Sequence, residues 1–424
     1  MNPLFSTWGA LAGLVLAGLL IVRKWPPVYA LVFAALAGGL IGGGGLVPTV
    51  EAMVTGAKGM MPPVLRILAS GILAGALIKT GAAARLANAI VAGLGPRFAL
   101  PAVALATMTI CAVGVFIDIA VITVAPVALA VGRRTGLPVP ALLLAMVGGG
   151  KAGNIVSPNP NTLAAADAFK IDLTALIGQN VVPAAVALVT TVVLARWVAG
   201  RAKPSPFGAP TGPGVDAENL EGAGISLMAA VFGPIAVVAL LALRPLCGLA
   251  VDPLLALPAG GLVTLLATRH VRDAARFAEF GLSKVAGVSV LLVGTGALAG
   301  IVKASTLTKD LIALIACAHL PSFALAPVSG VLMAGATAST TAGATVAAQT
   351  FSGTLLEAGV PAVAAAAMIH AGATVVDSLP HGSFFHATGG AVFMSIPERL
   401  RIIPYEALVG LAATGTSVVV YLFF

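Results

Sequence analysis

The amino-acid sequence predicts an all-α polytopic membrane protein with two inverted-topology repeats, each containing a re-entrant hairpin and a discontinuous transmembrane helix. Three observations carry this prediction. The composition is strongly apolar, the order of segments recurs in the second half of the chain, and each half has one apolar segment interrupted by a polar break. In proteins of this kind the two breaks lie at the centre of the fold.

The composition excludes an ordinary soluble domain. Of the 424 residues, 59% are hydrophobic and only 9% are charged, whereas soluble domains have about 25% charged residues. Several apolar runs are long enough to cross a ~30 Å hydrocarbon core, which takes about 20 helical residues. The net charge of +8 comes from Lys and Arg that gather between the apolar runs, as the positive-inside tendency predicts. We therefore expect contact with a lipid bilayer and none with nucleic acid.

The basic clusters and one polar segment predict the orientation of the chain. The first apolar span, Phe5–Val22, stops at Arg23 and Lys24, which places the N-terminus outside and this helix end in the cytoplasm. Residues 200–224 are polar and rich in Pro and Gly, which is typical of a linker. We expect a first repeat at 1–199, a cytoplasmic linker at 200–224, and a second repeat at 225–424 whose C-terminus lies outside.

The two repeats are indicated by similar sequences at a nearly constant separation. Leu73–Leu86, LAGALIKTGAAARL, is similar to Leu298–Leu311, LAGIVKASTLTKDL. The run GLPVPALLLAM that starts at Gly136 corresponds to GVPAVAAAAM, which starts at Gly359, and the separation of these two runs is almost the same as that of the first two. Because the first copy begins outside and the second begins after a cytoplasmic linker, the copies have opposite topology. Weak internal symmetry of this kind is typical of transporters.

Each half also contains an apolar segment that predicts a re-entrant hairpin. Ala99–Val131 is about 33 residues long, with basic clusters near both ends. Since both clusters favour the same side of the membrane, we expect this segment to turn back, with Asp118 near its tip. Its counterpart is Ser322–Glu357, whose polar tip begins at Ala338 with the sequence ASTTAGAT.

The discontinuous helices are predicted by polar, Pro-containing breaks. Pro138–Asp172 is interrupted at Gly148–Thr162, and Gly359–Ser395 is interrupted between Thr374 and Gly382. A half-helix N-terminus exposes unpaired N–H groups and a positive dipole end, which suit a carboxylate. If the breaks meet near the midplane, then Asn154 and Ser157 lie close to Asp377 and Ser378.

Candidate substrate-binding residues are the polar side chains at the breaks and hairpin tips. The alternatives are an extramembrane loop for the first break, helix-to-helix hydrogen bonds for the hairpin residues, and, for the lysine, a side chain that snorkels to the surface. The candidates are Lys151, Asn154, Ser157, Asn159, Asn161, Thr162, Ser339, Thr340, Thr341, Ser378 and His381.

Candidate proton-coupling residues are the ionisable groups expected at membrane depth, namely Asp118, Asp377 and His381. A charge inside the bilayer is costly and is by default functional. The structural alternative is an ion pair or hydrogen bond that fastens two helices together. Coupling to Na⁺ through the oxygens of the two breaks is also open, and so is the direction of net flux.

Signatures of enzymatic chemistry are missing from the sequence. It contains no P-loop, no HExxH and no GxSxG motif. The cysteines at 111, 247 and 317 do not have the spacing of metal ligands. We therefore expect no catalytic residue, no metal and no cofactor. A membrane-embedded enzyme that uses Asp118 and Asp377 as paired acids is the alternative from another class.

The chain resembles the gluconate permease (GntP-type) family of organic-acid:proton symporters, within the ion transporter superfamily. The residues that carry the resemblance are GILAGALIKTGAAARLA, VFIDIAVITVAPVALA, GGGKAGNIVSPNPNTLAAADAF, ASTTAG and VVDSLPHG. The resemblance implies a homodimeric secondary transporter of the bacterial inner membrane that moves its substrate by an elevator motion. The implied substrate is a small hydroxy-carboxylate such as gluconate or glycerate, taken up with protons. The gluconate members have a His- and Pro-rich first break, so the resemblance assigns no role to Lys151.

Overall fold

The computed structural model describes residues 4–423 except 24, 202–223, 308, 311, 312, 314–316, 318–320 and 381. Most of the predicted linker therefore lies outside the described residues, as does His381. Every regular element of the described chain is a helix. In chain order these are α1 (Thr7–Val22), α2 (Pro27–Ile41), α3 (Leu46–Lys58), α4 (Met61–Lys79), α5 (Ala82–Leu94), η1 (Pro96–Phe98), α6 (Ala99–Ala112), α7 (Ile117–Thr135), α8 (Val139–Asn154), α9 (Pro160–Phe169), α10 (Leu173–Gln179), α11 (Val181–Arg201), α12 (Leu227–Cys247), α13 (Pro253–Ala267), η3 (Val271–Asp273), α14 (Ala274–Lys303), η4 (Ser322–Ala324), α16 (Leu325–Thr337), α17 (Thr340–Glu357), α18 (Ala362–Gly372), α19 (Ser383–Ala391), α20 (Ile396–Leu400) and α21 (Ile403–Phe423).

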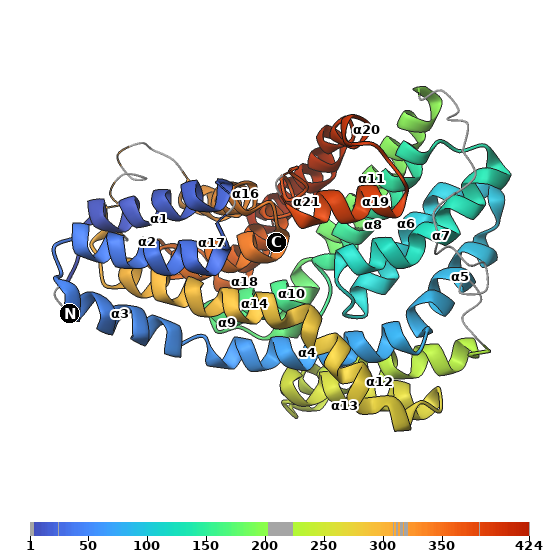
Figure 1. The fold of residues 1–424 in the computed structure, drawn as a ribbon, viewed down its shortest axis with the longest axis horizontal. Coiled ribbons are helices and arrows are strands. Elements are labelled where there is room, and N and C mark those ends of the chain that lie inside the picture. Colours follow the sequence, from blue (N-terminus) through green and yellow to red (C-terminus); the bar gives the residue numbers. More distant parts are fainter. Residues whose placement is uncertain are drawn as a thin grey trace.

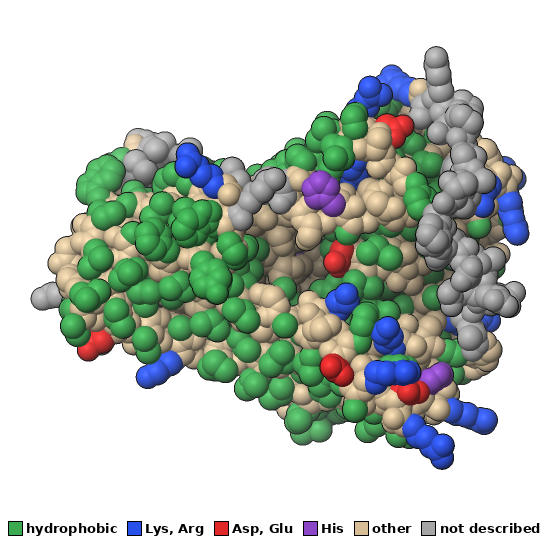
Figure 2. Space-filling view, viewed as in Figure 1, with side chains coloured by type: hydrophobic (Ala, Val, Ile, Leu, Met, Phe, Trp, Pro, Cys, Tyr) green, Lys and Arg blue, Asp and Glu red, His purple; other side chains and the backbone are tan. Residues whose placement is uncertain are grey.

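The helices confirm a polytopic membrane protein. Within the described chain, four helical segments are long and apolar enough to cross a bilayer, and a pair bent by 107° around η1 makes a fifth if counted as one span. The two longest, Leu46–Lys79 and Val271–Lys303, have 34 and 33 residues. Large apolar side chains are exposed over much of the face in Figure 2. Such a surface is stable against lipid and would be a liability in water.

Figure 1 shows how the long segments join the two ends of the molecule. Helices α1, α2 and α3 lie at one end, α5, α6 and α7 lie at the other, and α4 runs between them. The segment that contains Glu51 and Lys58 is helix α3, and it leads directly into α4. Gly56 of α3 lies against Gly296 and Gly300 of α14. This close glycine contact lets α3 pack tightly against α14.

Both predicted hairpins form. The first consists of α6 and α7, with Asp118 in the first turn of α7. The second consists of α16 and α17, which are separated by Ala338 and Ser339. The tips need unusual backbone angles, with φ of 106° at Gly114 and 46° at Ala338. Each tip thus reverses the chain over a few residues and starts a new helix at that level.

Both predicted helix breaks also form, but the first is shorter than the sequence suggests. The glycine run Gly148–Gly153 belongs to α8, so the break covers only residues 155–159. A Cβ at Gly149 would lie 2.1 Å from the carbonyl oxygen of Ala104 in α6. Glycine is therefore present to let two buried helices approach closely rather than to end one. The second break covers residues 373–382.

The second half repeats the element order of the first, and four consecutive helices follow their counterparts at one constant separation in the sequence, which we call the repeat offset. The helices that start at Ile117, Val139, Pro160 and Leu173 have counterparts that start at Thr340, Ala362, Ser383 and Ile396. The glycine contact recurs too, because a Cβ at Gly372 would lie 2.5 Å from the carbonyl oxygen of Pro327. Gly372 and Pro327 follow Gly149 and Ala104 by the same repeat offset.

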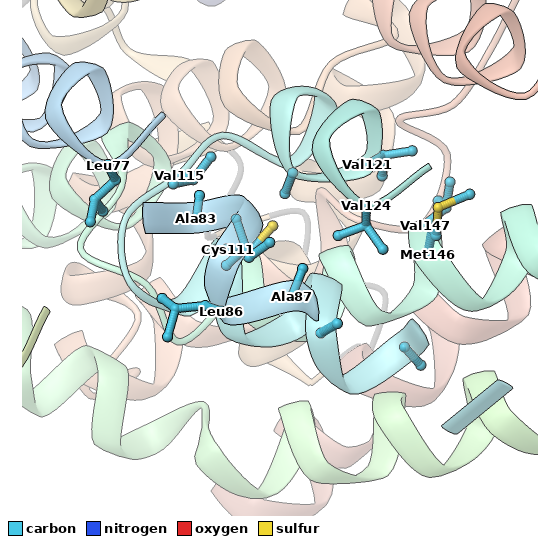
Figure 3. Close-up of a cluster of buried hydrophobic side chains, with 14 of the residues drawn as sticks. Leu77, Ala83, Leu86, Ala87, Cys111, Val115, Val121, Val124, Met146 and Val147 are labelled. Atoms are coloured by element: carbon cyan, nitrogen blue, oxygen red, sulfur yellow. The ribbon is translucent and has the colours of Figure 1, made fainter. Parts of the chain in front are cut away.

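A buried apolar cluster connects the first hairpin to its neighbours, as Figure 3 shows. Leu77 comes from α4, Leu86 from α5, Cys111 from α6, Val124 from α7 and Met146 from α8. Interlocked side chains from five helices leave little freedom at the packed positions. The hairpin tip and the first break, which extend from this cluster, are therefore held in place.

Candidate functional site

The two hairpin tips and the two breaks meet around one cavity of about 230 Å³. The side chains of α14 complete its wall. The lining residues are Phe116, Ile117, Asp118, Ile119, Asn154, Asn159, Asn161, Lys284, Val288, Ser339, Thr340, Thr341, Asp377, Ser383 and Phe384.

Four helices begin at this wall. Helices α7, α9, α17 and α19 start at Ile117, Pro160, Thr340 and Ser383, and residues at the start of each line the cavity. Each helix N-terminus carries a partial charge of about +0.5 and N–H groups without helical partners. The backbone alone therefore favours an anion in this space.

The wall is built from equivalent positions of the two halves. Five pairs of lining residues are separated by the repeat offset, namely Phe116 and Ser339, Ile117 and Thr340, Asp118 and Thr341, Asn154 and Asp377, and Asn161 and Phe384. The expected approach of the two breaks is therefore found for Asn154 and Asp377. Ser157 and Ser378 are buried but are not among the lining residues.

The first break is held by its own amides. The Asn159 side-chain oxygen accepts from the backbone N–H groups of Asn161, at 2.9 Å, and Thr162, at 3.2 Å, and so caps α9. Its amide nitrogen donates to the carbonyl oxygen of Asn154 at 2.8 Å. The Asn161 amide donates to the Asn154 side-chain oxygen at 3.0 Å. Asn154 Nδ2 and Asn161 Oδ1 are buried without a partner in the described structure, so one donor and one acceptor of the first break remain unsatisfied.

The second break is held by Asp377. Its Oδ1 lies 2.7 Å from Lys151 Nζ, and both side chains are 1% exposed. Oδ2 accepts from the Thr340 hydroxyl at 2.6 Å, and Oδ1 accepts from the Ser378 hydroxyl at 3.0 Å. Lys151 therefore does not snorkel to the surface. It is not a lining residue either, and it compensates the charge of Asp377, which does line the cavity.

The wall carries one cationic side chain among the lining residues, and the sequence did not single it out. Lys284 of α14 is exposed at the cavity, and its ammonium group is the cation that a bound ligand would meet there. The signal that could have identified Lys284 is its position along the helix. It lies about three turns after the start of α14, which runs from Ala274 to Lys303. This 30-residue helix is longer than the bilayer requires, so a charge at this depth can face a cavity.

Comparison with known proteins places the chain in a family. The model of the family described as GntP family permease matches residues 6–389. The chain belongs to the GntP permease family. A Haemophilus influenzae protein described as an uncharacterized transporter is 51% identical over 416 residues, which cover 98% of each chain. Another protein of that organism, described as an uncharacterized permease, is 26% identical over 190 residues, covering 44% of this chain and 39% of its own.

The fold of this GntP permease is similar to that of a solved transporter. The crystal structure of the Alcanivorax borkumensis YdaH transporter, whose topology is described as unusual, has a TM-score of 0.64 and 16% sequence identity, and the match covers 98% of each chain. The likeness at this identity concerns the fold alone. With the family, it confirms the predicted resemblance and a helical, polytopic architecture.

The remaining predicted residues of the permease lie close to the cavity in different roles. Ser339 caps α17 by accepting from the Ala342 N–H at 3.3 Å, and it lines the wall. Thr341 also lines the wall, whereas Thr162 is buried behind it. The ion-pair alternative is the one found for Asp377. His381 stays a prediction outside the described residues.

Proposed function

We propose that this permease is a secondary active symporter that moves a small organic anion with protons. The observation that carries the proposal is the cavity at which four helix N-termini and Lys284 meet. The helix ends and the ammonium attract a carboxylate. A substrate carboxylate bound there would lie beside the exposed ammonium group of Lys284.

The substrate class is a hydroxy-carboxylate such as gluconate or glycerate. The unpartnered Asn154 Nδ2 and Asn161 Oδ1 supply a donor and an acceptor on residues of the wall, and Ser339 and Thr341 add hydroxyls. Such groups favour the binding of a ligand that carries several hydroxyls, because an apolar ligand would leave their hydrogen bonds unsatisfied. The volume of about 230 Å³ suits a small acid.

The coupling proton is assigned first to Asp118. This carboxyl group lines the cavity and forms no ion pair among the described residues, whereas Asp377 is paired with Lys151. A carboxyl on the wall can exchange its proton with the cavity, and its charge then changes next to the substrate. His381 and Asp377 are the further candidates.

The architecture that we propose has two inverted repeats, 1–199 and 225–424, joined by a cytoplasmic linker at 200–224. It is supported by the helix starts and cavity residues that recur after the repeat offset. In this proposal the homodimer lies in the bacterial inner membrane with both termini outside. The hairpins and broken helices carry the substrate by an elevator motion against the remaining helices.

Uptake into proteoliposomes under an imposed pH gradient tests the function. We expect gluconate or glycerate to accumulate unchanged, and the Asp118→Asn variant to lose the response to the gradient, down to the rate of protein-free vesicles. Lys58→Ala, at an exposed position of α3, is the matched control and keeps full uptake. No accumulation of any hydroxy-acid by folded protein would sink the proposal. Uptake that follows a sodium gradient and ignores pH would favour Na⁺ coupling, and a chemically altered product would favour the enzyme.

A further inference from the structure

A buried ammonium group lies in a cage of oxygen atoms beside the cavity. Lys151 Nζ is 2.7 Å from the Asp377 carboxylate and 3.2 Å from the carbonyl oxygen of Glu406, and it also donates to the carbonyl oxygen of Thr374. A lysine ammonium has three N–H donors, so the three oxygens use all of them. The group is therefore fully coordinated by protein.

These oxygens are the kind that bind a monovalent cation. One is an anionic carboxylate and two are backbone carbonyls, and Thr374 belongs to the second helix break. Cation-coupled carriers coordinate their ion with unwound backbone carbonyls at such breaks. In this chain the position is filled by a positive charge attached to α8 rather than by an ion from solution.

The neighbouring ionisable groups leave Asp377 as the counter-ion of Lys151. The Glu406 carboxylate is bound by Arg399 at 2.6 Å, so Glu406 offers Lys151 its carbonyl oxygen only. His370, an ionisable group buried on α18, forms no hydrogen bond through either ring nitrogen in the described structure. The Asp377 carboxylate is thus the anion that balances Lys151.

Symmetry shows that the cage exists in one half only. Lys151 and Thr374 are separated by 223 residues, which is the repeat offset of the helices. The two equivalent positions therefore contact each other, and one of them is a lysine while the other is a threonine. Likewise Asp377 has Asn154 as its equivalent, so the cation and the anion of the pair each appear once.

We propose that the Lys151 ammonium is a tethered monovalent cation, which fills the site that a mobile Na⁺ or K⁺ takes in a cation-coupled carrier and frees this permease from requiring one. The second clause rests on the proposed transport function, whereas the first concerns binding alone. Because Asp377 keeps its tethered partner, Asp118 and His381 remain as the candidates for the coupling proton.

Removing the lysine tests the cage directly. Lys151→Ala deletes the ammonium group and three carbons of the side chain, a fragment that corresponds to propylammonium. The midpoint of thermal unfolding is measured in detergent with the chlorides of Na⁺, K⁺, propylammonium and choline at equal ionic strength. We expect the variant to unfold lowest in choline and to gain about 3 °C or more with at least one smaller cation. The wild type and Lys58→Ala show no such difference.

Two results of that measurement overturn the proposal. One is a Lys151→Ala protein whose midpoint is the same in all four salts, and the other is a wild type that Na⁺ or K⁺ stabilises in a saturable way. The double variant Lys151→Met with Asp377→Asn removes both charges and guards against a folding defect. If it folds while Lys151→Ala is unfolded in every salt, the cage does not accept a free cation and the proposal fails.

Wild-type uptake gives a separate readout that needs no variant. With all Na⁺ and K⁺ replaced by choline, uptake driven by a pH gradient is expected to stay within twofold of its rate in NaCl. A loss of uptake in choline alone would overturn the proposal. An absence of hydroxy-acid uptake in every medium would instead overturn the proposed function, and the thermal result would still decide whether the cage binds cations.

Discussion

The two helix breaks occupy equivalent positions of the two halves and are held in opposite ways. The first, at 155–159, is held by side-chain amides that lie within a few residues of it, mainly Asn154, Asn159 and Asn161. The second, at 373–382, relies on Asp377, whose partners include Lys151 of α8 and Thr340 of α17. The first break is thus stabilised locally, whereas the second depends on the assembled fold.

The two breaks are therefore stabilised by different kinds of interaction, although they occupy equivalent positions of the two halves. A network of neutral amides fixes the start of α9 without introducing charge. A buried ion pair fixes the second break and costs desolvation energy, which further hydrogen bonds must offset. Damage to the second break should therefore cost more free energy than equal damage to the first.

The largest expected difference in the free energy of unfolding is between variants at the equivalent positions Asn154 and Asp377. Asp377→Asn leaves the Lys151 ammonium buried without its anion, which should lower the free energy of unfolding by about 3–5 kcal/mol. Asn154→Ala removes neutral hydrogen bonds and should cost about 1–3 kcal/mol. Denaturant unfolding of both variants measures the two losses, and equal losses would contradict the comparison.

A smaller effect is expected where Thr340 supports the second break. Thr340→Val removes a hydrogen bond to a charged group, worth about 1.5–3 kcal/mol. Ile117 is the equivalent position in the first half and makes no such bond, so Ile117→Val, costing about 0.5–1.5 kcal/mol, is the matched control. If the two variants have the same free energy of unfolding within error, the hydrogen bond from Thr340 to Asp377 does not stabilise the second break.

The smallest effect on stability is expected at the cap of α9. Asn159→Ala removes a helix N-cap, usually worth about 1 kcal/mol, and the donation from Asn159 to the Asn154 carbonyl oxygen. Ser395→Ala, at the exposed capping box of α20, should cost a similar amount. Only the first should weaken the stabilisation that a hydroxy-acid gives in a thermal-shift measurement, because Asn159 lines the cavity. If both variants respond equally to the ligand, the first break is structural only.

The hairpins and breaks were predictable because their signals are local. An apolar segment of about 33 residues between basic clusters of the same side predicts a reversal, and α6 and α7 form it. Prolines such as Pro158 and Pro160 predict the end of one helix and the start of another. The recurrence of similar sequences at a nearly constant separation then allowed the second break to be paired with the first.

What the sequence did not reveal depends on distant contacts. Gly148–Gly153 looked like part of the break because glycine weakens an isolated helix, yet α6 packs against it and keeps it helical. The partner of Lys151 lies in the other half of the chain, at the second break. In the sequence Lys284 is one of several basic residues that follow Arg269, and only the course of α14 brings it to the cavity.

The length of the two longest helical segments gives lipid a mechanical role. The 34 residues of Leu46–Lys79 extend ~51 Å at ~1.5 Å per residue, while the hydrocarbon layer measures ~30 Å. A rod of this length accommodates by tilting or by protruding, and the compromise shifts with bilayer thickness. Val271–Lys303 is nearly as long and carries Lys284. A change in membrane thickness that tilts this helix would therefore move the ammonium group that faces the cavity.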